Sequence, residues 1–164
     1  MIGVETVLAV YPNAIGFGFA VVTDDVLNPL DCGVISIKPI DNVACISKVQ
    51  MLIEKFKTSS IIVQSLEGKH SHKTNRVVEL IEGIEILSIT RGLKLHKYSR
   101  EQIRFVFEQF EAKSKQEIAQ ALVEAIPHYA YRLPEPRKPW LPEHYNMGMF
   151  DALSLMLTHS YLTQ

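Results

Sequence analysis

The sequence contains few cysteines and no long apolar run. Its two cysteines, Cys32 and Cys45, form no CxxC or zinc-ligand spacing and stand in apolar surroundings, which is typical of reduced core residues. No apolar stretch approaches the ~20 residues that a membrane span needs. The first ten residues lack a basic region and a cleavage site, so no secretory signal is expected. These absences predict a soluble, cytoplasmic protein.

Familiar catalytic signatures are absent as well. No Ser-His-Asp or Cys-His arrangement stands out, and Gly16 and Gly18 lack the third glycine and the following helix of a nucleotide-binding fingerprint. The formal net charge of -1 argues against a strong attraction of the whole surface to nucleic acid. A local basic patch is still compatible with this balance, because lysine and arginine cluster in residues 69–76, 91–104 and 132–138.

What is present suits one globular domain spanning residues 1–164. Hydrophobic residues make up 47% of the 164 residues, enough for a sizeable core. Short apolar or alternating runs predict strands, and apolar positions at helical spacing predict helices. The expected strands are 7–10, 16–23, 33–38, 60–63 and 93–98, and the expected helices are 41–57, 73–91, one from Arg100, one after Ser114 and 145–162.

Local signals mark several of these boundaries. Asp41, Ser99 and Ser114 are placed to cap helices, and Glu117 completes a capping box with Ser114. Gly92 is a plausible helix stop. Residues 127–142 hold five prolines, which predicts a linker running extended over the surface, with its tryptophan anchored on the core.

The order of elements indicates an α/β fold. Three strands close together predict an antiparallel meander, and the strand-helix-strand units that follow predict parallel strands. The expected architecture is a mixed five-stranded sheet flanked by helices.

This order resembles the ribonuclease-H-like fold, and three local matches are similar to the RuvC-type Holliday-junction resolvases. The resemblance runs over nearly the whole chain. The matches are 10–12 followed by 16–18 (Val-Tyr-Pro and Gly-Phe-Gly), 97–104 running on to Lys115, and 151–153 (Asp-Ala-Leu) followed by Thr158 and His159.

The resemblance implies a catalytic centre of four carboxylates that hold a pair of Mg²⁺ ions for phosphodiester hydrolysis. In this sequence three of those positions are Tyr11, Gln64 and Gly148, and only Asp151 is an acid. Neutral side chains replace such ligands poorly, because Mg²⁺ prefers anionic oxygens. We therefore expect no cofactor, or Mg²⁺ if the site is active, and we expect the Tyr11 hydroxyl to find a partner such as Gln64 or Asp151.

Two other residues are weak candidates to complete a displaced metal site with Asp151. Glu67 follows the fourth strand by three residues. His144 stands seven residues before Asp151, so the two would share a helix face if the helix began early enough.

The resemblance also implies contact with nucleic acid. The positions expected to approach phosphates are basic and follow the fourth and fifth strands: Lys69, Lys73, Arg76, Arg104 and Lys115. The helix 73–91 carries apolar residues on more than one face, since Val78, Ile86 and Ile89 add to its inward set. The resemblance implies a homodimer that uses this helix, and the second apolar face is what such a dimer would cover.

Three functions remain open from the sequence. The first is binding of branched or structured DNA with a lost or weakened nuclease centre. The second is an active Mg²⁺-dependent junction endonuclease with displaced ligands. The third is a non-catalytic scaffold domain that binds a protein partner.

Overall fold

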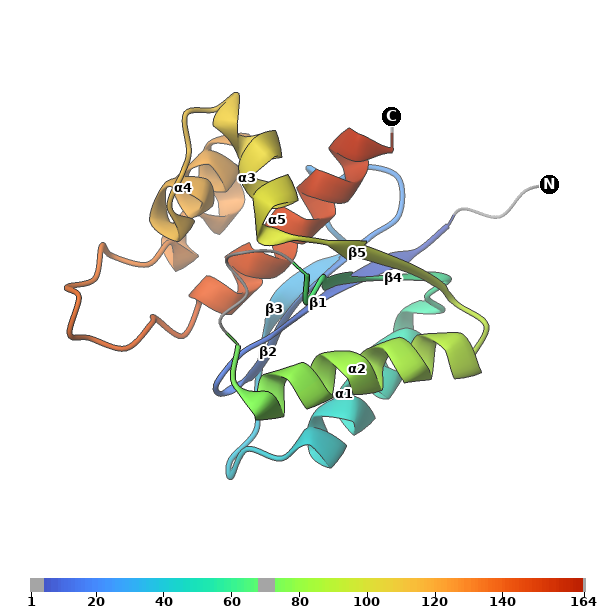
Figure 1. The fold of residues 1–164 in the computed structure, drawn as a ribbon. Helices are drawn as coiled ribbons and strands as arrows, with labels where there is room; N and C mark the ends of the chain where they lie inside the picture. The colour runs from blue at the N-terminus through green and yellow to red at the C-terminus, as the bar shows by residue number, and fades with distance from the viewer. Residues whose placement is uncertain (1–4, 68–72, 164) are drawn as a thin grey trace.

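The computed structural model describes residues 5–67 and 73–163. Its elements follow the predicted order, with one short 3-10 helix in addition (Figure 1). They are β1 (Val7–Pro12), β2 (Gly16–Val22), β3 (Asp31–Ser36), α1 (Asn42–Phe56), β4 (Ser60–Gln64), α2 (Asn75–Thr90), β5 (Lys94–Tyr98), α3 (Arg100–Glu108), α4 (Lys115–Ala125), η1 (Pro127–Arg132) and α5 (Met147–Leu162).

The five strands form one mixed sheet in the order β3-β2-β1-β4-β5. The first three strands are antiparallel, whereas β4 runs parallel to both β1 and β5. Every residue of β1, β2 and β4 is buried, because helices cover both faces of the sheet centre. The predicted mixed five-stranded fold is confirmed.

The sheet separates two hydrophobic clusters. Helices α1 and α2 cover one face, where Leu8 and Val10 of β1 point. Helix α5 crosses the other face and is itself covered by α3 and α4 (Figure 1). Ala9 and Tyr11 of β1 point toward α5 on this face. Because α5 is enclosed on most sides, its sequence is apolar almost all round.

The predicted helix signals are confirmed in the structure. The Asp41 carboxylate accepts hydrogen bonds from the backbone at the start of α1, and Ser99 and Ser114 each form a capping box. Gly92 follows the end of α2 with a positive φ of 69°, a conformation that costs glycine little.

The proline-rich segment differs from its prediction in two respects. Residues 127–132 form the 3-10 helix η1 instead of an extended linker, with Pro127 at its first turn, where no backbone N–H is needed. Trp140 is not anchored on the core: its side chain is 75% exposed. The turn from Lys138 to Leu141 directs it outward, and the final helix begins only at Met147.

None of the helices in the described part of the chain combines the length and the apolar character needed to cross a membrane.

Candidate functional site

The four positions of the expected metal centre converge on the α5 face of the sheet. Tyr11 stands one residue before the end of β1, and Gln64 ends the neighbouring strand β4; the parallel register pairs Ala9 with Ile62 two residues earlier. Helix α5 passes over these strand ends and carries Gly148 and Asp151 about one turn apart.

Gly148 lies directly against the backbone of the sheet. A Cβ atom on Gly18 of β2 would stand 1.8 Å from the Gly148 carbonyl oxygen, which no packing tolerates. A Cβ atom on Gly148 would stand 2.7 Å from the Asn13 amide nitrogen. Asn13 is held in place, because its side-chain oxygen accepts hydrogen bonds from the backbone of Ile15 and Gly16. A side chain at position 148 would therefore require the Asn13 amide to move from its place.

The remaining acid, Asp151, is paired with a lysine. The Lys115 ammonium at the start of α4 lies 3.2 Å from one Asp151 carboxylate oxygen and 3.1 Å from a Glu143 carboxylate oxygen. The Asp151 side chain is 5% exposed and that of Lys115 33%. A cation thus sits at this acid, but it is an ammonium supplied by the chain itself.

Tyr11 lies beneath two lysines. The ammonium of Lys73 is 4.9 Å from the centre of the Tyr11 ring, and that of Lys115 is 5.3 Å from it, both within cation–π range. Burial, with a smaller contribution from Asp151, raises the pKa of Tyr11 to about 12, so the phenol is neutral at pH 7. Burial and the neighbouring Lys115 lower the pKa of Lys73 to about 8.

Burial dominates the titration of Asp151. It raises the pKa of this carboxyl to about 6, although the cation of Lys115 opposes the shift. The pair is therefore charged at neutral pH and loses its charge on Asp151 in mild acid. Burial alone would lower the pKa of Lys115, but Asp151, Tyr11 and Glu143 raise it above the usual value.

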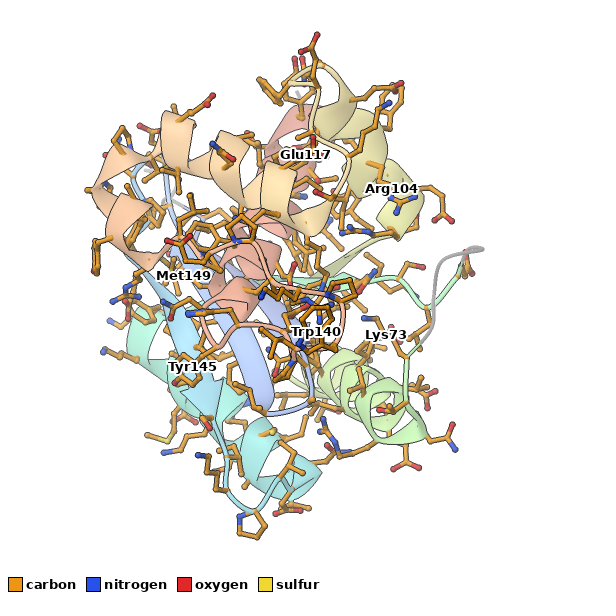
Figure 2. All side chains as sticks on the ribbon, turned by 90° about the vertical axis from the view of Figure 1, so that its left-hand side faces the viewer. Lys73, Arg104, Glu117, Trp140, Tyr145 and Met149 are labelled. Atoms are coloured by element: carbon orange, nitrogen blue, oxygen red, sulfur yellow. The ribbon has the colours of Figure 1, made fainter. Side chains whose placement is uncertain are left out.

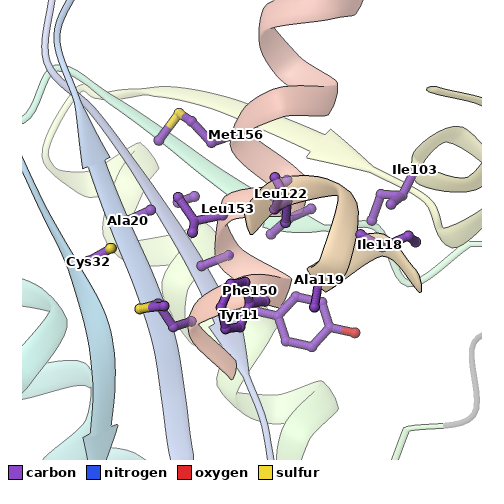
Figure 3. Packing of buried hydrophobic residues seen from close by; sticks show 14 of the residues in the cluster. Tyr11, Ala20, Cys32, Ile103, Ile118, Ala119, Leu122, Phe150, Leu153 and Met156 are labelled. Atoms are coloured by element: carbon purple, nitrogen blue, oxygen red, sulfur yellow. The ribbon is translucent and has the colours of Figure 1, made fainter. Parts of the chain in front are cut away.

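The predicted hydrogen bond between the Tyr11 hydroxyl and Gln64 or Asp151 is wrong. Within the described residues this hydroxyl makes no hydrogen bond to Gln64 or Asp151: Asp151 is bonded to Lys115, and the side-chain oxygen of Gln64 is buried with no partner. In Figure 3 the Tyr11 hydroxyl points away from the buried cluster around Ala20 and Leu153.

The weak metal candidates lie apart from Asp151 or lack the expected geometry. Glu67 is exposed and lines a different hollow, with Ser99 and Gln102. His144 lies outside α5, so the helix face that it would share with Asp151 does not exist; its ring accepts a hydrogen bond from the Asn146 backbone instead.

The basic candidates separate into different roles. Lys73 and Lys115 belong to the cluster over Tyr11, whereas the Arg76 guanidinium donates to Asn42 and to the Asn13 carbonyl, which ties the β1–β2 turn to α1. Lys69 lies outside the described residues.

A basic pocket next to Asp151 went unnoticed in the sequence. It has a volume of about 420 Å³ and borders Lys115 and Glu143. Its guanidinium groups come from Arg100 and Arg104 of α3, four residues apart on one helix face, and from Arg137 of the segment before α5. The spacing of the first two was a visible signal, but nothing in the sequence placed Arg137 beside them.

The residues present do not fit a pair of Mg²⁺ ions. Three of the four positions offer no carboxylate, and Asp151 is neutralised by Lys115. Within residues 5–67 and 73–163, no three His, Cys, Asp or Glu side chains converge as a metal site.

Comparison with known proteins identifies the fold. No protein-family model matches the sequence, and a search of curated proteins finds no match. Among solved structures, RuvC of Thermus thermophilus is 17% identical, with a TM-score of 0.65, over 97% of this chain and 95% of that one. The same enzyme in complex with a Holliday junction substrate gives 18% identity and a TM-score of 0.64 over the same shares of the two chains.

A eukaryotic structure gives the same answer. The yeast mitochondrial Holliday junction resolvase Ydc2 is 13% identical, with a TM-score of 0.65, over 99% of this chain and 82% of that one. The predicted likeness is thereby confirmed at the level of the fold. The chain has the ribonuclease-H-like fold of the RuvC-type resolvases, with Lys115 bound to Asp151 and Glu143.

Proposed function

We propose that this protein binds branched or structured DNA and does not cut it efficiently. The observation that carries the proposal is the ammonium of Lys115, held 3.2 Å from Asp151 and 3.1 Å from Glu143. Metal-assisted hydrolysis needs anionic oxygens that are free to bind the metal. At this site the buried carboxylate of Asp151 already has a cation, and the other three expected ligand positions carry no carboxylate.

Nucleic-acid binding is supported by the charges around the site. Arg100, Arg104 and Arg137 line the pocket beside Lys115, and the Lys73 ammonium lies over Tyr11. Such cations bind phosphates and position DNA without reading its sequence. A protein of the same fold has been solved with a Holliday junction, which supports a branched substrate for this chain.

A synthetic four-way junction tests both parts of the proposal. We expect binding in an electrophoretic mobility assay without added metal, and no cleavage above background with Mg²⁺ or Mn²⁺. Cleavage that is abolished by chelator and by Asp151→Ala would refute the loss of activity. Failure to bind either the junction or a duplex of equal length at low salt would refute DNA binding.

We also propose that two copies associate through α2. The helix buries one face on the sheet, and yet Ile86 and Ile89 on its outer side are exposed. Covering a second apolar face of a helix with a partner is favourable, because it removes apolar surface from water. Light scattering at tens of micromolar tests this, and a strictly monomeric mass would refute it.

Binding of a protein partner is the second candidate function. An exposed apolar groove favours it: Phe105 of α3 and Tyr161 near the end of α5 are both exposed and line the same groove. A chain that binds no DNA at low salt would leave this function as the better supported one.

A further inference from the structure

The chain has a single tryptophan, Trp140, and the structure displays it. Its indole is 75% exposed, although burying an indole is favourable. A tight turn holds it: the Leu141 N–H donates to the Lys138 carbonyl at 3.0 Å, and the Arg137 guanidinium donates to the Leu141 carbonyl. The Lys138 ammonium lies 5.4 Å from the ring centre. A flat aromatic surface thus stands outside the core on a braced turn.

This turn connects two stretches of the chain that line the basic pocket, but Trp140 itself is not a lining residue. The residues on either side of it, Pro136 and Arg137 before and Glu143 and His144 after, line the pocket. Figure 2 views the molecule from the side of the segment before α5, with Trp140, Arg104 and Lys73 labelled. The indole therefore stands three residues along the chain from Arg137, at the edge of the pocket.

The pocket carries unbalanced positive charge. Lys115 and Glu143 pair with each other, and no ion pair among the described residues involves Arg100, Arg104 or Arg137. Glu135 is the only other acid among the lining residues that the structure describes. Unpaired guanidinium groups bind phosphate well, because their donors match two phosphate oxygens at once.

We propose that the pocket and Trp140 form a subsite for one unpaired nucleotide of DNA, with its phosphate on the arginines and its base stacked on the indole. The inference rests on the proposed DNA-binding function and specifies that the site selects unpaired nucleotides over paired ones. A base inside a duplex has both faces covered by its neighbours, so an indole stacks only on a base that is splayed out or single-stranded. Junctions and their ends provide such bases.

The fluorescence of the single tryptophan reports directly on this contact. Titration with oligothymidylate should quench the emission of Trp140, whereas a blunt duplex of equal length should quench it far less. Trp140→Ala should weaken oligothymidylate binding about 5- to 150-fold, the equivalent of the ~1–3 kcal/mol that one stacked base contributes. Trp140→Phe should restore most of that loss, because phenylalanine keeps an aromatic face.

Two further variants separate the parts of the subsite. Arg100→Gln should weaken binding of oligothymidylate but leave the quenching at saturation unchanged, because the phosphate contact is lost and the base contact remains. Tyr131→Ala is the matched control: Tyr131 is 76% exposed and stands beside Arg132, but it does not line the pocket. This control should bind like the wild type.

Three results would overturn the inference. If the junction binds but the tryptophan emission stays constant and Trp140→Ala binds normally, the subsite is refuted and the proposed function stands. If Trp140→Ala weakens the binding of duplex and of single-stranded DNA equally, the indole only supports the loop and the subsite is again refuted. If no DNA binds at low salt, both the subsite and the proposed function are refuted.

Discussion

Replacing Lys115 by methionine removes the one cation bonded to Asp151 while keeping most of the aliphatic volume. Breaking a buried ion pair from one side typically costs about 3–5 kcal/mol, because the other charge stays buried without a partner. The Lys115 side chain is 33% exposed, so water reaches it and weakens the pair. We therefore expect Lys115→Met to lower the free energy of unfolding by about 2–3 kcal/mol near pH 8.

The loss should depend on pH in a defined direction. The pKa of Asp151 is about 6 in the folded protein, above the value of about 3.9 for an unfolded chain. The folded state therefore holds this proton more tightly, and its stability falls as the pH rises from about 4 to about 6. Without the lysine the folded pKa rises further, so the decline continues to higher pH. The difference between variant and wild type should be small near pH 5 and grow toward pH 8.

Urea unfolding at a series of pH values measures this difference. Lys113→Met is the matched control, because Lys113 is exposed two residues away and forms no ion pair among the described residues; its effect should stay within about 0.5 kcal/mol. Adding Asp151→Leu to Lys115→Met should recover stability, since a pair of apolar residues buries no charge. A loss for Lys115→Met that is the same at pH 5 and pH 8 would show that the carboxylate is not paired as described.

Three further outcomes follow from the structure. Gly18→Ala should prevent folding or lower the free energy of unfolding by at least about 3 kcal/mol, because its Cβ would lie 1.8 Å from a carbonyl oxygen of α5. Gly33→Ala should be tolerated, because its Cβ would lie 3.4 Å from an aromatic carbon, and thermal unfolding of the two variants checks the difference. Arg104→Glu should weaken junction binding and lower the salt slope of log K by about 1, and an unchanged slope would exclude a phosphate contact. Ile86→Lys with Ile89→Lys should yield monomers by light scattering, and persistent dimers would place the interface elsewhere.

Much of the fold was predictable because its signals are local. The apolar runs of β1 and β4 and the capping residues Asp41, Ser99 and Ser114 act within one or two turns of the chain. The segment before α5 was not predictable in this way. Its prolines indicate only that no regular helix runs through it. Whether Trp140 turns inward depends on the brace from Arg137 to Leu141.

The site was predictable only as a set of positions. The resemblance located Tyr11, Gln64, Gly148 and Asp151, and the fold brings them to one end of the sheet. The ion pair between Asp151 and Lys115 was not predicted, because the two residues lie 36 positions apart in the sequence. Lys115 was instead expected to contact DNA phosphates. Which charges meet across such a separation is decided by how α4 packs on α5.

The contact between Gly18 and Gly148 also sets a direction for change over evolutionary time. Helix α5 rests on β2 so closely that a side chain at position 18 must lift the helix, whereas a side chain at position 148 must move the Asn13 amide. A single mutation of Gly148 to aspartate would therefore disturb the hydrogen bonds that the Asn13 side chain accepts from the β1–β2 turn before it could offer a metal ligand. A lineage with this backbone would regain the acid without that loss only by changing position 13 as well, whereas sequence changes on the open face, around the arginines and the tryptophan, need no such second change.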